Sequence, residues 1–127
     1  MFRQVNPNPK GSYVGDCVVR ALCVATGKAW HDVYLDICLE GFMMCDMPSS
    51  NRVWGNYLQS LGYKAYAIPF VCNGCYSVRD FCGEHFKGKY VVGTGTHVLT
   101  IVDGDYYDSW DSGDEQPVYY WTREEIN

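Results

Sequence analysis

The chain has 127 residues, which is enough for one domain with a substantial core and too few for two. A hydrophobic content of 47% and an aromatic content of 16% argue against disorder, and a net charge of −5 without a basic cluster argues against nucleic acid or an anionic membrane as the main partner. No apolar run reaches the roughly 18 residues of a membrane-spanning helix, and the first residues lack the apolar core of a signal peptide, so we expect a cytoplasmic protein.

The N-terminal part predicts an extended segment followed by a buried helix. Residues 1–14 contain two prolines and a glycine among polar residues, which favours an extended lead-in. Asp16 is a suitable N-cap for a helix over 17–26, which ends at Gly27. Because this helix has almost no polar face, we expect it to be central and buried.

Two further helices are predicted in the first half of the chain. Apolar residues recur at intervals of three and four over 29–40, and Gly41 follows as the expected C-cap. The same periodicity predicts a third helix near 50–61.

Beyond Gly62 the pattern changes toward alternation, which is typical of strands. A short helix is expected near 77–86. The expected strands are 63–70, 89–95, 96–103, 106–110 and 117–121. Helices followed by an antiparallel sheet predict an α+β fold, and we assign residues 1–127 to a single domain.

Seven cysteines raise the question of whether one of them is reactive. Their odd number and the absence of an export signal favour reduced thiols. A helix N-terminus lowers the pKa of a thiol, because the backbone dipole and unpaired N–H groups stabilise the anion. Cys17 occupies that position, whereas Cys23 lies more than a turn further along and is expected to be a buried apolar residue.

A nucleophilic cysteine needs a base and a group that orients the base. His97 begins the most regular predicted strand. If Asp103-Gly104 forms a two-residue hairpin loop, residue 99 pairs with 108, and Asp108 lies diagonally across from His97 on the same face. A three-residue loop would place Asp111 there instead, so Asp111 is the reserve acid.

The order of these residues resembles the papain-like cysteine peptidase superfamily, and most closely its small single-domain members from bacteria and phages. A cysteine opens a long buried helix, a histidine starts a strand, and "DSW" at 108–110 is similar to the Asn-Ser-Trp of papain. The resemblance implies a helical half led by Cys17, packed on an antiparallel sheet. It also implies that Trp110 shields the His97–Asp108 pair.

The resemblance further implies an oxyanion hole, formed by the backbone N–H of Cys17 and a side-chain amide. Papain-like enzymes usually carry a glutamine about six residues before the cysteine, where this chain has Gly11. We favour Asn8 as the substitute, with Asn6 and Gln4 as alternatives.

A second group of residues has a spacing that would suit a zinc site. Cys72, Cys75, Cys82 and His85 have the spacing C-x2-C-x6-C-x2-H, which a structural zinc ion could use. The Asn-Gly pair between the first two cysteines equally predicts a turn beside ordinary buried thiols, and we prefer that interpretation.

These observations together predict a cysteine peptidase that needs no cofactor and cleaves a peptide or isopeptide bond in a peptide or protein substrate. Cys17 attacks the carbonyl, His97 transfers the proton and Asp108 orients His97. One alternative is an amidase or acyltransferase with the same three residues. The other is a non-catalytic interaction module on a papain-like scaffold, with or without zinc. No oligomeric state is predicted, and the relevant cytoplasm is that of the host cell if the chain is phage-encoded.

Overall fold

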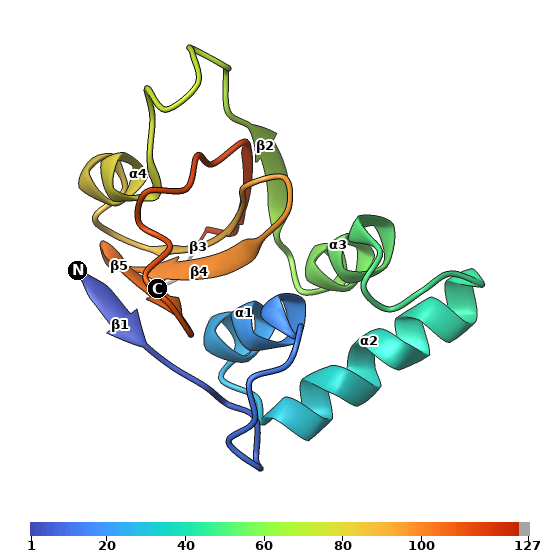
Figure 1. The fold of residues 1–127 in the computed structure, drawn as a ribbon. Coiled ribbons are helices and arrows are strands. Elements are labelled where there is room, and N and C mark those ends of the chain that lie inside the picture. The colour runs from blue at the N-terminus through green and yellow to red at the C-terminus, as the bar shows by residue number, and fades with distance from the viewer. Residues whose placement is uncertain (125–127) are drawn as a thin grey trace.

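The computed structural model describes residues 1–124 and places four helices and a six-stranded sheet within them, which confirms the α+β class (Figure 1). The helices are α1 (Cys17–Thr26), α2 (Trp30–Met44), α3 (Asn51–Ser60) and α4 (Val78–Glu84). The strands are β1 (Phe2–Gln4), β2 (Lys64–Ala67), β3 (Lys89–Gly93), β4 (Val98–Val102), β5 (Asp105–Asp108) and β6 (Tyr119–Thr122). No helix in the described part of the chain is long and apolar enough to cross a membrane.

The sheet is mixed rather than purely antiparallel. Its strand order is β1-β5-β4-β3-β6-β2, and every neighbouring pair is antiparallel except β1 and β5, which are parallel. β1 lies in the segment expected to be merely extended. Three residues are too few for an alternating pattern to reveal a strand, so its pairing with β5 was not predictable from the local sequence.

The β4–β5 hairpin has the predicted loop. Val102 pairs with Asp105, and the two loop residues between them, Asp103 and Gly104, have φ values of 49° and 83°. Two left-handed residues in a two-residue loop are the signature of a type I′ turn. The predicted register is therefore confirmed for the pairs next to the loop.

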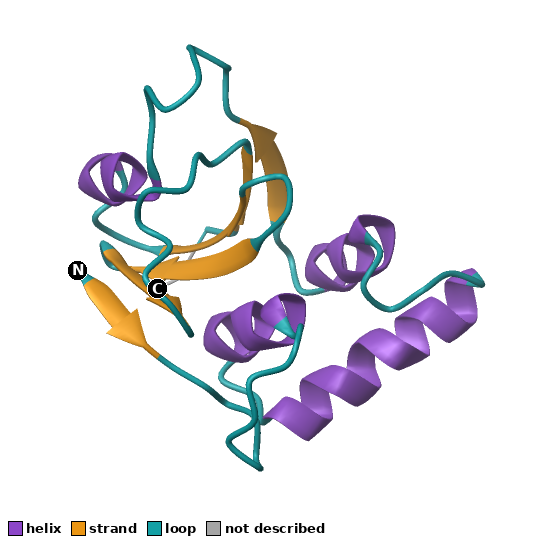
Figure 2. Ribbon diagram, in the orientation of Figure 1, coloured by secondary structure: helices purple, strands orange, loops and turns teal. Residues whose placement is uncertain are grey.

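The sheet separates two apolar clusters. Val91 and Val98 belong to the cluster shared with α1, α2 and α3, whereas Val92 and Leu99 belong to the cluster shared with α4. Figure 2 shows α1, α2 and α3 on one side of the molecule and α4 apart from them. The alternation of strand residues between two faces places α1 directly against the sheet, where the Thr100 hydroxyl donates a hydrogen bond to the Ala21 carbonyl (2.6 Å).

The helix α2 does not end at Gly41 as predicted. It continues to Met44, and Cys45 (φ 54°) caps it with a backbone N–H directed at the Gly41 and Phe42 carbonyls. Gly41 instead allows a close approach, because a Cβ atom there would lie 2.7 Å from the Asp46 carbonyl oxygen.

Candidate active site

Cys17 is the first residue of α1, where the helix dipole favours a thiolate. A hydrogen bond with His97 lowers the pKa of the Cys17 thiol most, with further help from the Val98 backbone and the positive charge of Arg20, against the opposing effect of burial. Cys23 and Cys82 differ, because burial raises the pKa of each to about 11. The site therefore distinguishes Cys17 electrostatically from two other thiols of the chain.

His97 lies immediately before β4, which begins at Val98 and not at His97 as predicted. Its carbonyl accepts a hydrogen bond from the Thr94 N–H (2.9 Å), which fixes the turn that carries it. Its Nε2 lies 2.5 Å from Asp108 Oδ2. Burial disfavours the imidazolium, but hydrogen bonds with Asp108 and Cys17 outweigh it and raise the pKa of His97 to about 9.

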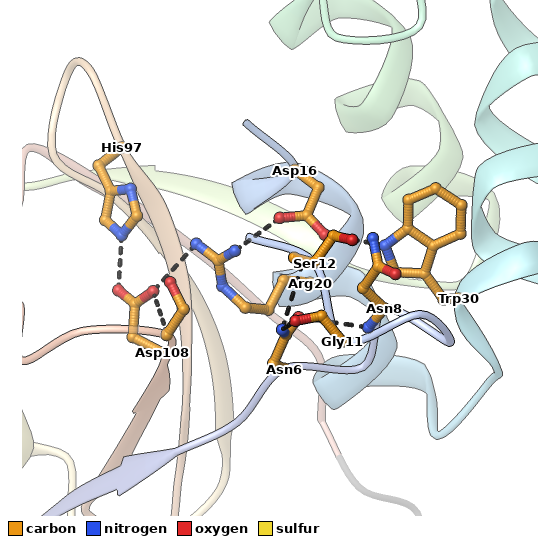
Figure 3. A network of polar contacts seen from close by, with 10 residues as sticks. Asn6, Asn8, Gly11, Ser12, Asp16, Arg20, Trp30, His97 and Asp108 are labelled. Carbon is orange, nitrogen blue, oxygen red and sulfur yellow. Dashed lines mark hydrogen bonds and ion pairs between the residues drawn. The ribbon is translucent and has the colours of Figure 1, made fainter. Parts of the chain in front are cut away.

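Asp108 is fully buried at the end of β5 and is surrounded by donors (Figure 3). Besides His97, the Ser112 hydroxyl donates to Oδ2 (2.6 Å), the Ser109 N–H donates to Oδ1 (2.8 Å), and Arg20 Nη2 lies 3.1 Å from Oδ1. Burial alone would raise the pKa of Asp108, yet hydrogen bonds led by that from His97 lower it. The buried carboxylate is thus held ionised against His97.

Asp111, the reserve acid, lies elsewhere. Its carboxylate accepts a hydrogen bond from the Tyr106 hydroxyl (2.6 Å) and pairs with Arg79 (3.2 Å). The even-length hairpin loop therefore brings Asp108, and not Asp111, to His97.

Asp16 occupies the predicted N-cap position of α1, but its side chain makes no capping hydrogen bond. It accepts hydrogen bonds from Arg20 Nη1 (2.7 Å) and Trp30 Nε1 (2.9 Å) instead (Figure 3). A buried arginine can compete with the backbone N–H groups for this carboxylate, because its hydrogen bonds are charge-assisted.

Arg20 and Ser112 were not identified from the sequence. A hydroxyl four residues after Asp108 carries no distinctive signal. Arg20 did carry a sequence signal, because it is the single charged residue in the otherwise apolar stretch of α1. It also lies four positions after Asp16, which is the spacing of a helical ion pair.

Trp110 lies beside His97. Its ring centroid is 5.0 Å from that of His97, and 47% of the residue is exposed. The indole ring therefore lies against His97 and is partly open to solvent, and its shielding role stays a prediction.

The three amide candidates for the oxyanion hole are held in the segment before α1. The Asn6 side-chain amide donates to the Gly11 and Ser12 carbonyls (3.1 and 3.2 Å), and the Asn8 side-chain oxygen Oδ1 accepts from the Lys10 N–H (2.9 Å). Gln4 approaches the Tyr13 hydroxyl at 3.5 Å. None of the three lines the cleft at Cys17 in the described structure, so it does not bring the predicted amide to the nucleophile.

The zinc ligands do not form a site. Cys72 and Cys75 are joined by a disulfide, so the prediction of reduced thiols is wrong at this pair. Cys82 is buried in the α4 cluster and His85 stacks on Phe81. Residues 1–124 contain no group of three or more side chains arranged to hold a metal ion.

Cys17 and His97 line an open cleft of about 500 Å³. Its walls come from the start of α1, one face of α2, the segments 48–51 and 95–98, and β6. Much of the surface is apolar: Val18, Trp30, Tyr34, Ile37 and Tyr119. A cleft of this volume is in the range that binds small molecules or a short stretch of peptide.

In comparisons with known proteins, no family model, curated protein or solved structure matches the chain. The chemistry of the site therefore rests on its own residues. A thiol at a helix start, an imidazole and a buried carboxylate that meet at a cleft can carry out nucleophilic acyl transfer.

Proposed function

We propose that this protein is a cysteine hydrolase of the papain-like type, which cleaves a peptide or isopeptide bond through a thioester. The observation that carries the proposal is the series Cys17–His97–Asp108, with Cys17 at the start of α1 and at the open cleft. Support for the papain-like assignment comes from the order of these residues along the chain and from the placement of the base immediately before β4 and of the acid at the end of the adjacent strand β5.

The proposed reaction has two halves. The Cys17 thiolate adds to the substrate carbonyl carbon, and the protonated His97 gives its proton to the leaving amine as the C–N bond breaks, which leaves a thioester. His97, now neutral, takes a proton from water, whose oxygen attacks the thioester. The acid product departs, and the thiolate and imidazolium are restored. Asp108 keeps His97 oriented and favours the imidazolium throughout.

The oxyanion of each tetrahedral intermediate needs a hydrogen-bond donor. The backbone N–H of Cys17 is suitable, because the first N–H groups of a helix have no partner within the helix. A second donor is not assigned to Asn8, given the place of Asn8 outside the cleft.

The cleft favours a peptide with an apolar side chain near the scissile bond. Trp30, Tyr34 and Ile37 supply an apolar wall beside Cys17. An amidase or acyltransferase on a smaller substrate would use the same three residues, and the outcome of a substrate screen separates it from a peptidase.

The test is hydrolysis of a peptide library made by digesting a cell extract, with new cleavage ends identified by mass spectrometry. The wild-type protein and Cys45→Ser, which alters an exposed thiol after α2, should generate the same ends. Cys17→Ala should generate none, because it lacks the nucleophile. Cleavage by Cys17→Ala at the wild-type rate would contradict the proposal.

A further inference from the structure

We propose that Arg20 is a positioning residue of this site: its guanidinium joins the carboxylate beside the nucleophile to the carboxylate that orients the base. The inference rests on the proposed function, in which Cys17 is the nucleophile and His97 the base. In this role Arg20 aligns α1 with β5 and does not touch the substrate.

The Arg20 guanidinium lies between two carboxylates and forms an ion pair with each of them. Arg20 Nη1 lies 2.7 Å from Asp16 Oδ1, and Arg20 Nη2 lies 3.1 Å from Asp108 Oδ1. The exposed fractions of the side chains are 6% for Arg20, 5% for Asp16 and 0% for Asp108. A planar guanidinium can donate in two directions from one rigid plane, which a lysine ammonium cannot do.

The bridge connects two elements that are distant in sequence. Arg20 belongs to the same helix as Cys17, one turn further along, while Asp108 ends β5 and holds His97. The Trp30 indole fixes the other carboxylate, that of Asp16, from α2. Any shift of α1 along the sheet would therefore break a buried ion pair as well as the contact between Cys17 and His97.

Buried ion pairs contribute little to stability relative to apolar residues, because desolvation offsets their attraction. A buried arginine between two carboxylates therefore needs a reason other than stability, and alignment of the reacting groups supplies one. The positive charge also favours the Cys17 thiolate. The ionisable groups around that thiolate are Asp16 and Arg20 from the start of α1, His97 before β4, Asp108 from β5 and Tyr119 from β6.

The experiment measures the rate of Cys17 alkylation by iodoacetamide from pH 4 to 10, for wild type, Arg20→Met and Arg20→Lys. Arg20→Met removes the charge but keeps most of the volume. We expect its midpoint to rise by about half to one pH unit, and its rate at any pH below the wild-type midpoint to fall roughly three- to tenfold. Arg20→Lys keeps the charge without the fork and should lie between the two.

The matched control is Arg79→Met, which removes an exposed arginine that likewise pairs with two aspartates, Asp111 and Asp114. Its midpoint and rate should equal those of the wild type. A purely structural role for Arg20 would lower the melting temperature and leave the midpoint of the folded protein unchanged, and that result would overturn the proposal.

Two outcomes keep this inference separate from the proposed function. If wild-type Cys17 reacts no faster than an ordinary thiol, the proposed function fails, whatever Arg20 does. If wild-type Cys17 is reactive and both Arg20 variants keep its midpoint and rate, only the role of Arg20 is overturned. Should Arg20→Met not fold, an Arg20→Lys profile identical to the wild type would overturn it equally.

Discussion

At the residue scale, two aspartates three positions apart show how surroundings decide a role. Asp108 is completely buried and accepts hydrogen bonds from His97 and Ser112, whereas Asp111 is half-exposed and pairs with Arg79. The pKa of each carboxyl is lowered, but only Asp108 lies against an imidazole. A low pKa alone therefore does not identify the functional acid.

Replacing Asp108 with asparagine should lower the pKa of His97. The carboxylate helps to raise that pKa to about 9, and an amide at the same position carries no charge. In an NMR titration of the imidazole protons, we expect the midpoint of Asp108→Asn to fall by one unit or more, on the order expected for loss of an adjacent charge. Hydrolysis needs the imidazolium form of His97, and the variant should lose that form at lower pH. The alkaline limb of its pH–rate profile should therefore move down from about 9.

Asp111→Asn is the control for that titration, because Asp111 contacts Tyr106 and Arg79 rather than His97. Its His97 midpoint should equal the wild-type value. A midpoint unchanged in Asp108→Asn, or lowered equally in both variants, would show that Asp108 does not govern the base.

Sequence reasoning identified Cys17, His97 and Asp108, which the structure brings together, because a helix start and a hairpin loop are local features. It did not identify Arg20, whose second partner lies on another element. It also favoured Asn8 from sequence distance alone. The side chains of that segment instead bond within it, as when Asn8 accepts from Lys10, and such turn geometry is not visible in spacing.

At the element scale, features set by local sequence could be predicted, whereas features set by contacts between distant segments could not. The bounds of α1 and the loop between β4 and β5 follow from an apolar run and an Asp-Gly pair. The end of α2 does not, because Gly41 has the composition of a C-cap but serves a tertiary contact with Asp46. The parallel pairing of β1 with β5 joins residues about 100 positions apart and leaves no local pattern.

The close contact at Gly41 makes a direct prediction. In Gly41→Ala the added methyl would lie 2.7 Å from the Asp46 carbonyl oxygen, so the free energy of unfolding should fall by about 1–3 kcal/mol. Gly83→Ala, also in a helix but with open space around the added methyl, should instead gain up to about 1 kcal/mol through helix propensity. Urea unfolding measures both, and equal effects of the two substitutions would contradict the assignment of Gly41.

At the scale of the whole molecule, one sheet lies between two apolar clusters, and the site lies where α1 meets β4 and β5. Leu22 is fully buried in the cluster on the α1 side, and Phe81 is fully buried in the cluster on the α4 side. Because both clusters share the strands β3 and β4, we expect the chain to unfold as a single domain.

Leu22→Ala and Phe81→Ala test that expectation. Each should lower the free energy of unfolding, by about 2–5 and 3–5 kcal/mol respectively, through the loss of buried apolar contacts. Tryptophan fluorescence and far-UV circular dichroism should report the same single transition for both variants. Two separate transitions, each sensitive to only one substitution, would contradict a single domain.

The central claim is that Cys17 is a thiolate activated by His97, and competitive alkylation tests it most directly. Cys45 is exposed, whereas Cys17 is only partly accessible, so exposure alone predicts that Cys45 reacts first. Activation predicts the opposite order. With iodoacetamide at pH 7 and peptide mapping by mass spectrometry, Cys17 should react about tenfold faster than Cys45, and His97→Ala should abolish that advantage. Faster labelling of Cys45 in the folded wild-type protein would contradict the claim.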